Sequence, residues 1–164
     1  MVHQKKSLRA VIFNSEGTLF SASGNMRPLS LAEGEREKDQ GRTGTPEMYF
    51  MPGAIEILSL LHRLGFKLGL LSLYPQECKL ALKRAGLPAD NFVLVSGSKY
   101  EDYYQESHKI VFLIKECLQK MMVDIDESIY VGSTPDDYWA GEMVEIDALV
   151  ISPSLNNLGL PHSA

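Results

Sequence analysis

The chain has 164 residues, of which 45% are hydrophobic and 23% are charged. This length suffices for one globular core and is short for two, so we expect a single domain over residues 1–164. The formal net charge of −5 disfavours a broad attraction to nucleic acid or to an anionic membrane surface, and no nucleic-acid partner is predicted.

Neither a membrane span nor a signal peptide is predicted. The most apolar stretch, residues 55–74, is interrupted by Arg63 and Lys67, which are costly in lipid, and the N-terminus lacks a long apolar run. Two cysteines, Cys78 and Cys117, are too few for a disulfide framework and lack zinc-ligand spacing, so we expect buried free thiols. These features favour a cytoplasmic protein with no membrane partner.

The N-terminal part predicts a buried strand followed by a long loop. Residues 8–13 (LRAVIF) form a short β-branched and aromatic run that stops at the turn-forming residues 14–17 (NSEG). From residue 21 to about residue 45 the chain carries four glycines, a proline and the charged block at residues 33–39. We expect residues 21–45 to form a mobile loop beside the end of the first strand, since connections of this length are usually functional or disordered.

The next segment predicts a helix that faces the core. Residues 54–64 lie between a Pro-Gly pair and Gly65, and their apolar side chains recur at a spacing of three. Ile57 and Leu60 widen this apolar face.

Strands and helices alternate in the rest of the chain. Short apolar runs predict further strands at residues 66–73, 92–95, 129–131 and 149–151. Helices are expected to begin near Pro75, Ser107 and Pro135. Large apolar residues on these helices are expected to pack in the core: Met121, Met122 and Trp139. This alternation predicts a parallel α/β sandwich, in which the strand ends are the default ligand site.

Three short motifs at predicted strand ends resemble those of the haloacid dehalogenase-like superfamily. Residues 13–19 (FNSEGTL) are similar to its first motif, an apolar strand followed by DxDGT. Residues 70–72 (LLS) are similar to the second motif, an apolar strand that ends in Ser or Thr, and residues 132–137 (GSTPDD) to the last, typically GDxxxD. The motifs occur in the family's order and span nearly the whole chain.

The resemblance implies a three-layer Rossmann-like sandwich with a central parallel sheet. Members of the superfamily commonly carry a cap domain either after the first motif or between the second and third. Here the first position holds only residues 21–45 and the second an ordinary βα unit, so we expect no large cap domain and an open site.

In active members, the resemblance implies, the first Asp attacks phosphorus, the second protonates the leaving group, and Mg²⁺ neutralises charge. Asn14 occupies the nucleophile position, and a carboxamide cannot form the aspartyl-phosphate intermediate. Glu16 keeps the second carboxylate with one extra methylene, and Ser133 replaces the first acidic metal ligand of the last motif. Glu16, Asp136 and Asp137 remain as candidate ligands of a Mg²⁺ site that is expected to be weak or absent.

The third family motif supplies a lysine at the start of a helix, and Lys109 is nearest to that place, with Lys99 and Lys115 as alternatives. By resemblance, Ser72 and Lys109 are therefore equivalent to catalytic residues, together with Asn14 and Glu16. Thr18, Ser72 and Lys109, with backbone N–H groups, are predicted to hold a phosphate without catalysis.

The predicted function is that of a catalytically weak or inactive phosphatase homologue. It would bind a phosphorylated small molecule, a phosphoprotein or another protein partner, the last through residues 21–45 or a flexible tail at residues 155–164. An empty vestigial pocket is a further possibility. The alternative is a Mg²⁺-dependent phosphomonoester hydrolase with an atypical active site that uses Glu16.

Overall fold

The computed structural model describes residues 6–22, 48–100 and 105–151. Strands and helices alternate along the chain, and short 3₁₀ turns lie at Ala89–Asn91, Gly97–Tyr100 and Ile125–Glu127. The strands are β1 (Ala10–Asn14), β2 (Phe20–Ala22), β3 (Met48–Phe50), β4 (Lys67–Ser72), β5 (Phe92–Ser96), β6 (Ser128–Gly132) and β7 (Asp147–Val150). The helices are α2 (Ala54–Arg63), α3 (Pro75–Arg84), α4 (Glu106–Met121) and α5 (Pro135–Val144).

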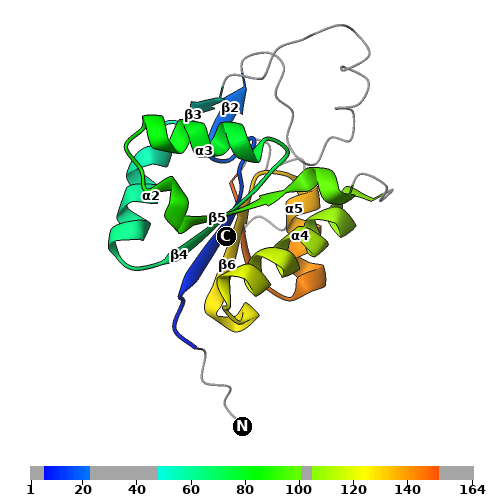
Figure 1. The fold of residues 1–164 in the computed structure, drawn as a ribbon. Helices are drawn as coiled ribbons and strands as arrows, with labels where there is room; N and C mark the ends of the chain where they lie inside the picture. The colour runs from blue at the N-terminus through cyan, green and yellow to red at the C-terminus, as the bar shows by residue number, and fades with distance from the viewer. Residues whose placement is uncertain (1–5, 23–47, 101–104, 152–164) are drawn as a thin grey trace, which may run out of the picture.

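Five strands form one parallel sheet in the order β5-β4-β1-β6-β7, and β1 is its central strand. Helices α2 and α3 cover one face of the sheet and α4 and α5 the other, as Figure 1 shows. This arrangement confirms the predicted three-layer sandwich with a central parallel sheet. Because β1, β4 and β6 are neighbours and parallel, their carboxyl ends meet at one edge of the sheet.

Two apolar cores form on the two faces of the sheet, because successive side chains of a strand point to opposite sides. Ile12 of β1 faces the core beneath α4 and α5, where Leu113 is fully buried. Phe13, the next residue, faces the core beneath α2 and α3, together with Leu58 and Leu70. β1 is buried along its whole length, as the apolar run at residues 8–13 predicts.

Helix α2 lies where the Pro-Gly pair and Gly65 predict it, but its apolar face is narrower than expected. Leu58 is fully buried, whereas Ile57 and Leu60 are about half exposed. On a helix with 3.6 residues per turn, Leu60 lies on the side opposite Leu58 and Ile57 lies about 100° around from Leu58, on the flank of the helix. Their predicted role in widening the core-facing surface is therefore wrong.

Two other packing predictions also need correction. Trp139 is 57% exposed, because the neighbouring Ala140 takes the position on α5 that faces the core. The Trp139 ring packs edge-to-face against Tyr138. Met121 is buried as expected, but Met122 is 81% exposed. Met122 follows the last turn of α4 in a left-handed conformation, with φ of 53°, and so lies beyond the part of the helix that packs.

The beginning of α4 and the hairpin β2/β3 also differ from expectation. Helix α4 begins at Glu106 after Gln105, so Ser107 lies inside its first turn and does not cap it. The antiparallel pair β2/β3 was not predicted, and β2 includes Ser21 from the start of the expected loop. Most of the predicted loop at residues 21–45 and all of the predicted tail at residues 155–164 lie outside the described residues.

The described residues contain no cap domain. The hairpin β2/β3 lies at the position after the first motif where superfamily members commonly carry one (Figure 1). Both cysteines are buried free thiols, as predicted. None of the described helices combines the length and apolar character that a membrane crossing requires.

Candidate functional site

Four buried polar side chains gather at the carboxyl ends of β1, β4 and β6: Asn14, Glu16, Ser72 and Asp137. Asn14 is the last residue of the central strand, and the chain then turns sharply at Gly17, whose φ of 81° favours glycine. The turn is closed by the carbonyl of Ser15, which accepts hydrogen bonds from backbone N–H groups of residues 18–20. This turn brings Glu16 back toward the end of β4.

Asp137 is the centre of the first of two polar clusters. Its Oδ1 accepts hydrogen bonds from Asn14 Nδ2 at 2.8 Å and from the Tyr130 hydroxyl at 2.5 Å. Its Oδ2 accepts from the backbone N–H groups of Ser133 and Thr134, at 2.8 and 3.0 Å, and from the Thr134 hydroxyl at 3.0 Å. Asp137 is fully buried and joins β1, β6 and the beginning of α5.

The backbone beside Asp137 requires a glycine at the end of β6. A Cβ atom on Gly132 would lie 2.3 Å from Asp137 Cγ and 2.5 Å from its Oδ2, far inside van der Waals contact. Gly132, the first residue of the last motif, therefore leaves the space that the Asp137 carboxylate occupies between β6 and α5.

Asn14 presents its amide nitrogen to Asp137, and its other polar atom is left without a partner. A carboxylate only accepts hydrogen bonds, so the neighbouring carboxamide must turn its NH₂ group toward it. Asn14 Oδ1 is buried and has no hydrogen-bond partner among the described residues.

The second cluster joins Glu16 to the end of β4. The Ser72 hydroxyl donates a hydrogen bond to Glu16 Oε1. It accepts hydrogen bonds from the backbone N–H of Tyr74 at 2.8 Å and from the Cys78 thiol at 3.2 Å. Ser72 is thus fully engaged within the protein. Glu16 Oε2 is buried without a partner among the described residues.

Burial dominates the electrostatics of this second cluster. It raises the pKa of Glu16 from an ordinary value of 4.5 to about 7, against the opposing effect of the Ser72 hydrogen bond. Burial, and to a lesser extent the Glu16 charge, raises the pKa of Cys78 to about 12. Cys78 is therefore a protonated thiol, and it does not supply a nucleophile at neutral pH.

Tyr130 was missed by the sequence analysis. Burial, and next the charge of Asp137, raises its pKa well above the ordinary value, so its hydroxyl keeps the proton that it donates to Asp137. It pairs with Ile12 in the sheet and faces the same core. The sequence places this tyrosine in the middle of an apolar strand. A buried tyrosine hydroxyl needs a hydrogen-bond partner, so this position could have indicated a polar contact there.

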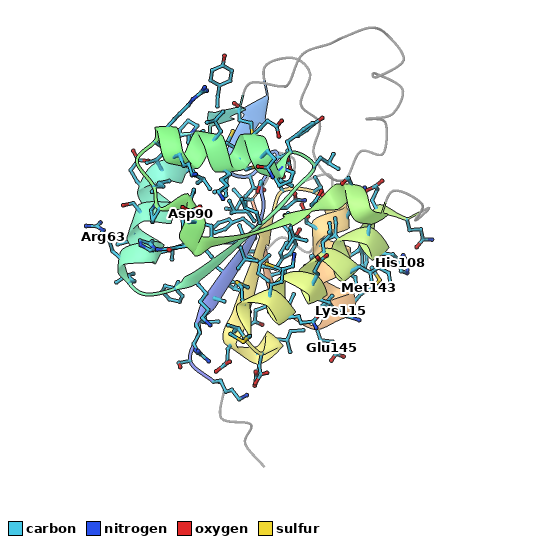
Figure 2. The ribbon with its side chains drawn as sticks, viewed as in Figure 1. Arg63, Asp90, His108, Lys115, Met143 and Glu145 are labelled. Atoms are coloured by element: carbon cyan, nitrogen blue, oxygen red, sulfur yellow. The ribbon has the colours of Figure 1, made fainter. Side chains whose placement is uncertain are left out.

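Lys109 is buried, 5% exposed, at the beginning of α4. Burial raises the pKa of the nearby Glu106. The positive charge of Lys109 lowers that pKa, and the negative charge of Asp136 raises it. By contrast, the alternative Lys115 is exposed further along α4 (Figure 2). The other alternative, Lys99, has no described side chain.

Thr18 lies in the turn that follows β1, and Asp136 lies in the first turn of α5. Thr18 is half-buried, and its Oγ1 is buried without a partner among the described residues. Burial, and then the neighbouring Asp137, raises the pKa of Asp136. The structure thus joins Asn14 to Asp137 and Glu16 to Ser72, in two separate networks.

The residues present do not fit a magnesium ion. No group of three or more His, Cys, Asp or Glu side chains among the described residues is arranged to hold a metal. A carboxylate offers about four lone-pair directions, and five protein donors already point at Asp137. Glu16, another of the three predicted ligands, accepts a hydrogen bond from Ser72.

No protein-family model and no curated protein matches the sequence. Solved structures do match. A predicted phosphatase from Clostridium acetobutylicum has a TM-score of 0.65 and 15% identity, covering 94% of this chain and 92% of that one. An uncharacterized protein from Listeria monocytogenes serotype 4b has a TM-score of 0.61 and 21% identity, covering 95% and 84%.

A third match is the L-2-haloacid dehalogenase from Xanthobacter autotrophicus, solved with chloropropionic acid covalently bound. Its TM-score is 0.59 and its identity 14%, covering 88% of this chain and 77% of that one. The chain therefore has the fold of these structures, which is the fold that the resemblance in the three motifs implies.

Proposed function

We propose that this protein is a catalytically inactive homologue of the haloacid dehalogenase-like phosphatases and that it acts by binding. The observation that carries the proposal is the hydrogen bond from Asn14 Nδ2 to Asp137 Oδ1 at 2.8 Å. At the nucleophile position the chain has a neutral amide whose nitrogen is directed at a carboxylate, where the reaction needs an unpaired carboxylate oxygen.

Two other contacts support loss of hydrolysis. Ser72, predicted to hold a phosphate, is engaged with Glu16, the Tyr74 backbone and Cys78, so its hydroxyl has no hydrogen left to donate. Ser133 contributes only a backbone N–H to Asp137.

Thr18 and Lys109 carry the proposed binding role. Thr18 Oγ1 has no partner among the described residues, and Lys109 places a buried ammonium group at the beginning of α4. A hydroxyl and an ammonium are donors that a phosphate group accepts. The ligand class is a phosphorylated small molecule or a phosphoprotein. The two buried free thiols favour a reducing compartment, so we place the protein in the cytoplasm.

The test of inactivity is Mg²⁺-dependent phosphate release from a panel of phosphomonoesters. We compare the native protein with the triple variant Asn14→Asp, Glu16→Asp, Ser133→Asp, both checked for folding by circular dichroism. We expect no release by the native protein and measurable release by the triple variant, which restores the carboxylates. Native turnover above that of a buffer blank would contradict the proposal.

The test of binding uses inorganic phosphate as the probe. We expect it to raise the melting temperature of the native protein, and to do so far less in Lys109→Met, which keeps the length of the side chain without its charge. Lys115→Met, on the exposed part of the same helix, is the matched control and should respond like the native protein. An equal response of the native protein and Lys109→Met would exclude Lys109 from the site.

One observation favours the alternative of an atypical Mg²⁺-dependent hydrolase. Glu16 has a pKa of about 7 and an unpartnered Oε2, which suits a group that exchanges protons at neutral pH. If the native protein releases phosphate and Glu16→Gln abolishes that release, the alternative is established. Turnover that survives in Glu16→Gln would point to a contaminating phosphatase.

A further inference from the structure

The surroundings of Asp137 bear on the metal chemistry of the fold. Asp137 is 0% exposed, and each of its two oxygens accepts at least two hydrogen bonds from the protein. Burying an ionised carboxylate is costly unless charge or hydrogen bonds compensate, and the five donors that reach Asp137 are all neutral. Asp137 therefore has both of its oxygens satisfied by the protein itself.

We infer that the Asn14 amide and the Tyr130 hydroxyl take the place of a divalent cation at Asp137, so that the site excludes Mg²⁺ and the carboxylate is a structural anchor between β1, β6 and α5. This inference rests on the proposed function, to which it adds that the native site does not bind a metal ion.

The geometry of Asn14 explains the exclusion. A cation that approached Asp137 Oδ1 from the end of β1 would meet the positive end of the Asn14 amide dipole at 2.8 Å from that oxygen. Asn14 Oδ1, the one atom of this side chain that ligates metals, belongs to the other end of the same planar group. Metal binding would require the amide to rotate and the Asn14 and Tyr130 hydrogen bonds to Oδ1 to be displaced.

The difference between Asn and Asp at position 14 makes the inference testable. In Asn14→Asp, two carboxylate oxygens would face each other where a hydrogen bond now joins Asn14 and Asp137. Like charges at this separation in a buried site repel, and a divalent cation between them removes the repulsion. One substitution should therefore convert a metal-independent site into one that depends on metal.

The experiment measures melting temperature in EDTA, in millimolar MgCl₂, and in a monovalent salt of the same ionic strength. We expect the native protein to melt at the same temperature in MgCl₂ and in the matched salt. Asn14→Asp should melt lower than the native protein in EDTA and recover with MgCl₂ in a saturable manner. Asn14→Ala is the matched control, because it loses the hydrogen bond without gaining a charge and should not respond to MgCl₂.

A saturable rise of the native melting temperature in MgCl₂ would overturn the inference, and so would an Asn14→Asp variant that folds but ignores MgCl₂. If Asn14→Asp does not fold, the inference is tested on the native protein alone, by titrating it with Mn²⁺ as a paramagnetic probe of metal binding. We expect its electron spin resonance signal to remain that of the free aquo ion, and one bound Mn²⁺ per chain would overturn the inference.

These readouts separate the inference from the proposed function. Metal binding by the native protein without phosphate release would refute the inference and leave the proposed inactivity standing. Phosphate release without metal binding would refute the proposed inactivity and leave the exclusion of metal standing.

Discussion

Asn14 differs from aspartate only in carrying an amide NH₂ in place of one carboxylate oxygen, and that difference reverses what Asp137 meets at the end of β1. An aspartate would add a second negative charge, whereas the amide donates a hydrogen bond at 2.8 Å. Because hydrogen bonds to charged groups are worth about 1.5–3 kcal/mol each, the polar cluster contributes to the stability of the fold.

Replacing Asp137 by alanine should lower the free energy of unfolding by roughly 3 kcal/mol or more. The substitution leaves the Asn14 amide, the Tyr130 hydroxyl and two backbone N–H groups without their acceptor in a buried site. Urea denaturation measures the loss. Asp136→Ala, one residue earlier and partly exposed, is the control and should cost about 1 kcal/mol or less. Equal losses in the two variants would show that Asp137 is not the anchor we describe.

Glu16 should make the protein less stable as the pH rises. Its pKa is about 7 when folded and near 4.5 when unfolded, so between these values the folded state holds a proton that the unfolded state has lost. The free energy of unfolding is therefore unaffected by this group below pH 4.5 and falls as the pH rises from 4.5 to 7. Above pH 7 the loss is complete, at roughly 3 kcal/mol.

The Glu16→Gln variant isolates this effect, because a glutamine does not titrate and keeps the shape of the side chain. Denaturation of both proteins across the pH range should show the advantage of the variant growing between pH 4.5 and 7. A difference between the two proteins that is independent of pH would mean that folding does not shift the pKa of Glu16.

At the scale of elements, α5 and the polar site share their key residues. Thr134 is the N-cap of α5 and Pro135 its first residue, and the Thr134 hydroxyl accepts from the Asp137 backbone N–H at 3.3 Å. The Asp137 carboxylate in turn accepts from the Thr134 backbone N–H at 3.0 Å, which completes a capping box. The start of the helix therefore holds Asp137 in position for Asn14.

Thr134→Ala should lower the free energy of unfolding by about 1–2 kcal/mol, because it removes the cap of α5 and one donor to Asp137. Thr134→Ser keeps the hydroxyl and should restore most of the loss. Thermal denaturation of the two variants distinguishes the hydroxyl from the methyl group. If Thr134→Ser is as unstable as Thr134→Ala, the packing of the threonine methyl group contributes more to the free energy of unfolding than the cap does.

Sequence alone predicted the elements that are long or sharply delimited. Helix α2 was predicted because glycines bracket its apolar repeat, and β1, β4 and β6 because their apolar runs are short and continuous. The hairpin β2/β3 was missed because its strands have three residues each and are far apart in sequence. Trp139 was misplaced because its hydrophobicity does not reveal which side of α5 faces the sheet.

At the scale of the whole molecule, one sheet separates two cores that share strands β1, β4, β5 and β6. Leu58 of α2 and Leu113 of α4 are fully buried, one in each core. Replacing either by alanine should cost about 2–5 kcal/mol and leave a single unfolding transition, because the strands between the cores belong to both. Circular dichroism at far- and near-ultraviolet wavelengths tests this, and two separate transitions in either variant would show that the faces unfold independently.

The site was predictable in composition but not in connectivity. The motifs at strand ends indicated that Asn14, Glu16, Ser72 and Asp137 would lie at one edge of the sheet, and they do. Sequence did not reveal that they pair into two separate networks, because the pairing depends on which way each side chain turns at its strand end. Tyr130, which completes one network, lies outside every motif.

Internal hydrogen bonds close the Asp137 site to metal. The most direct measurement is a high-resolution crystal structure of the native protein grown in millimolar MgCl₂. We predict that Asn14 Nδ2 and the Tyr130 hydroxyl still contact Asp137 Oδ1, with no cation beside it. An octahedrally coordinated ion bound to Asp137, with the Asn14 amide rotated to place Oδ1 on the metal, would contradict the account.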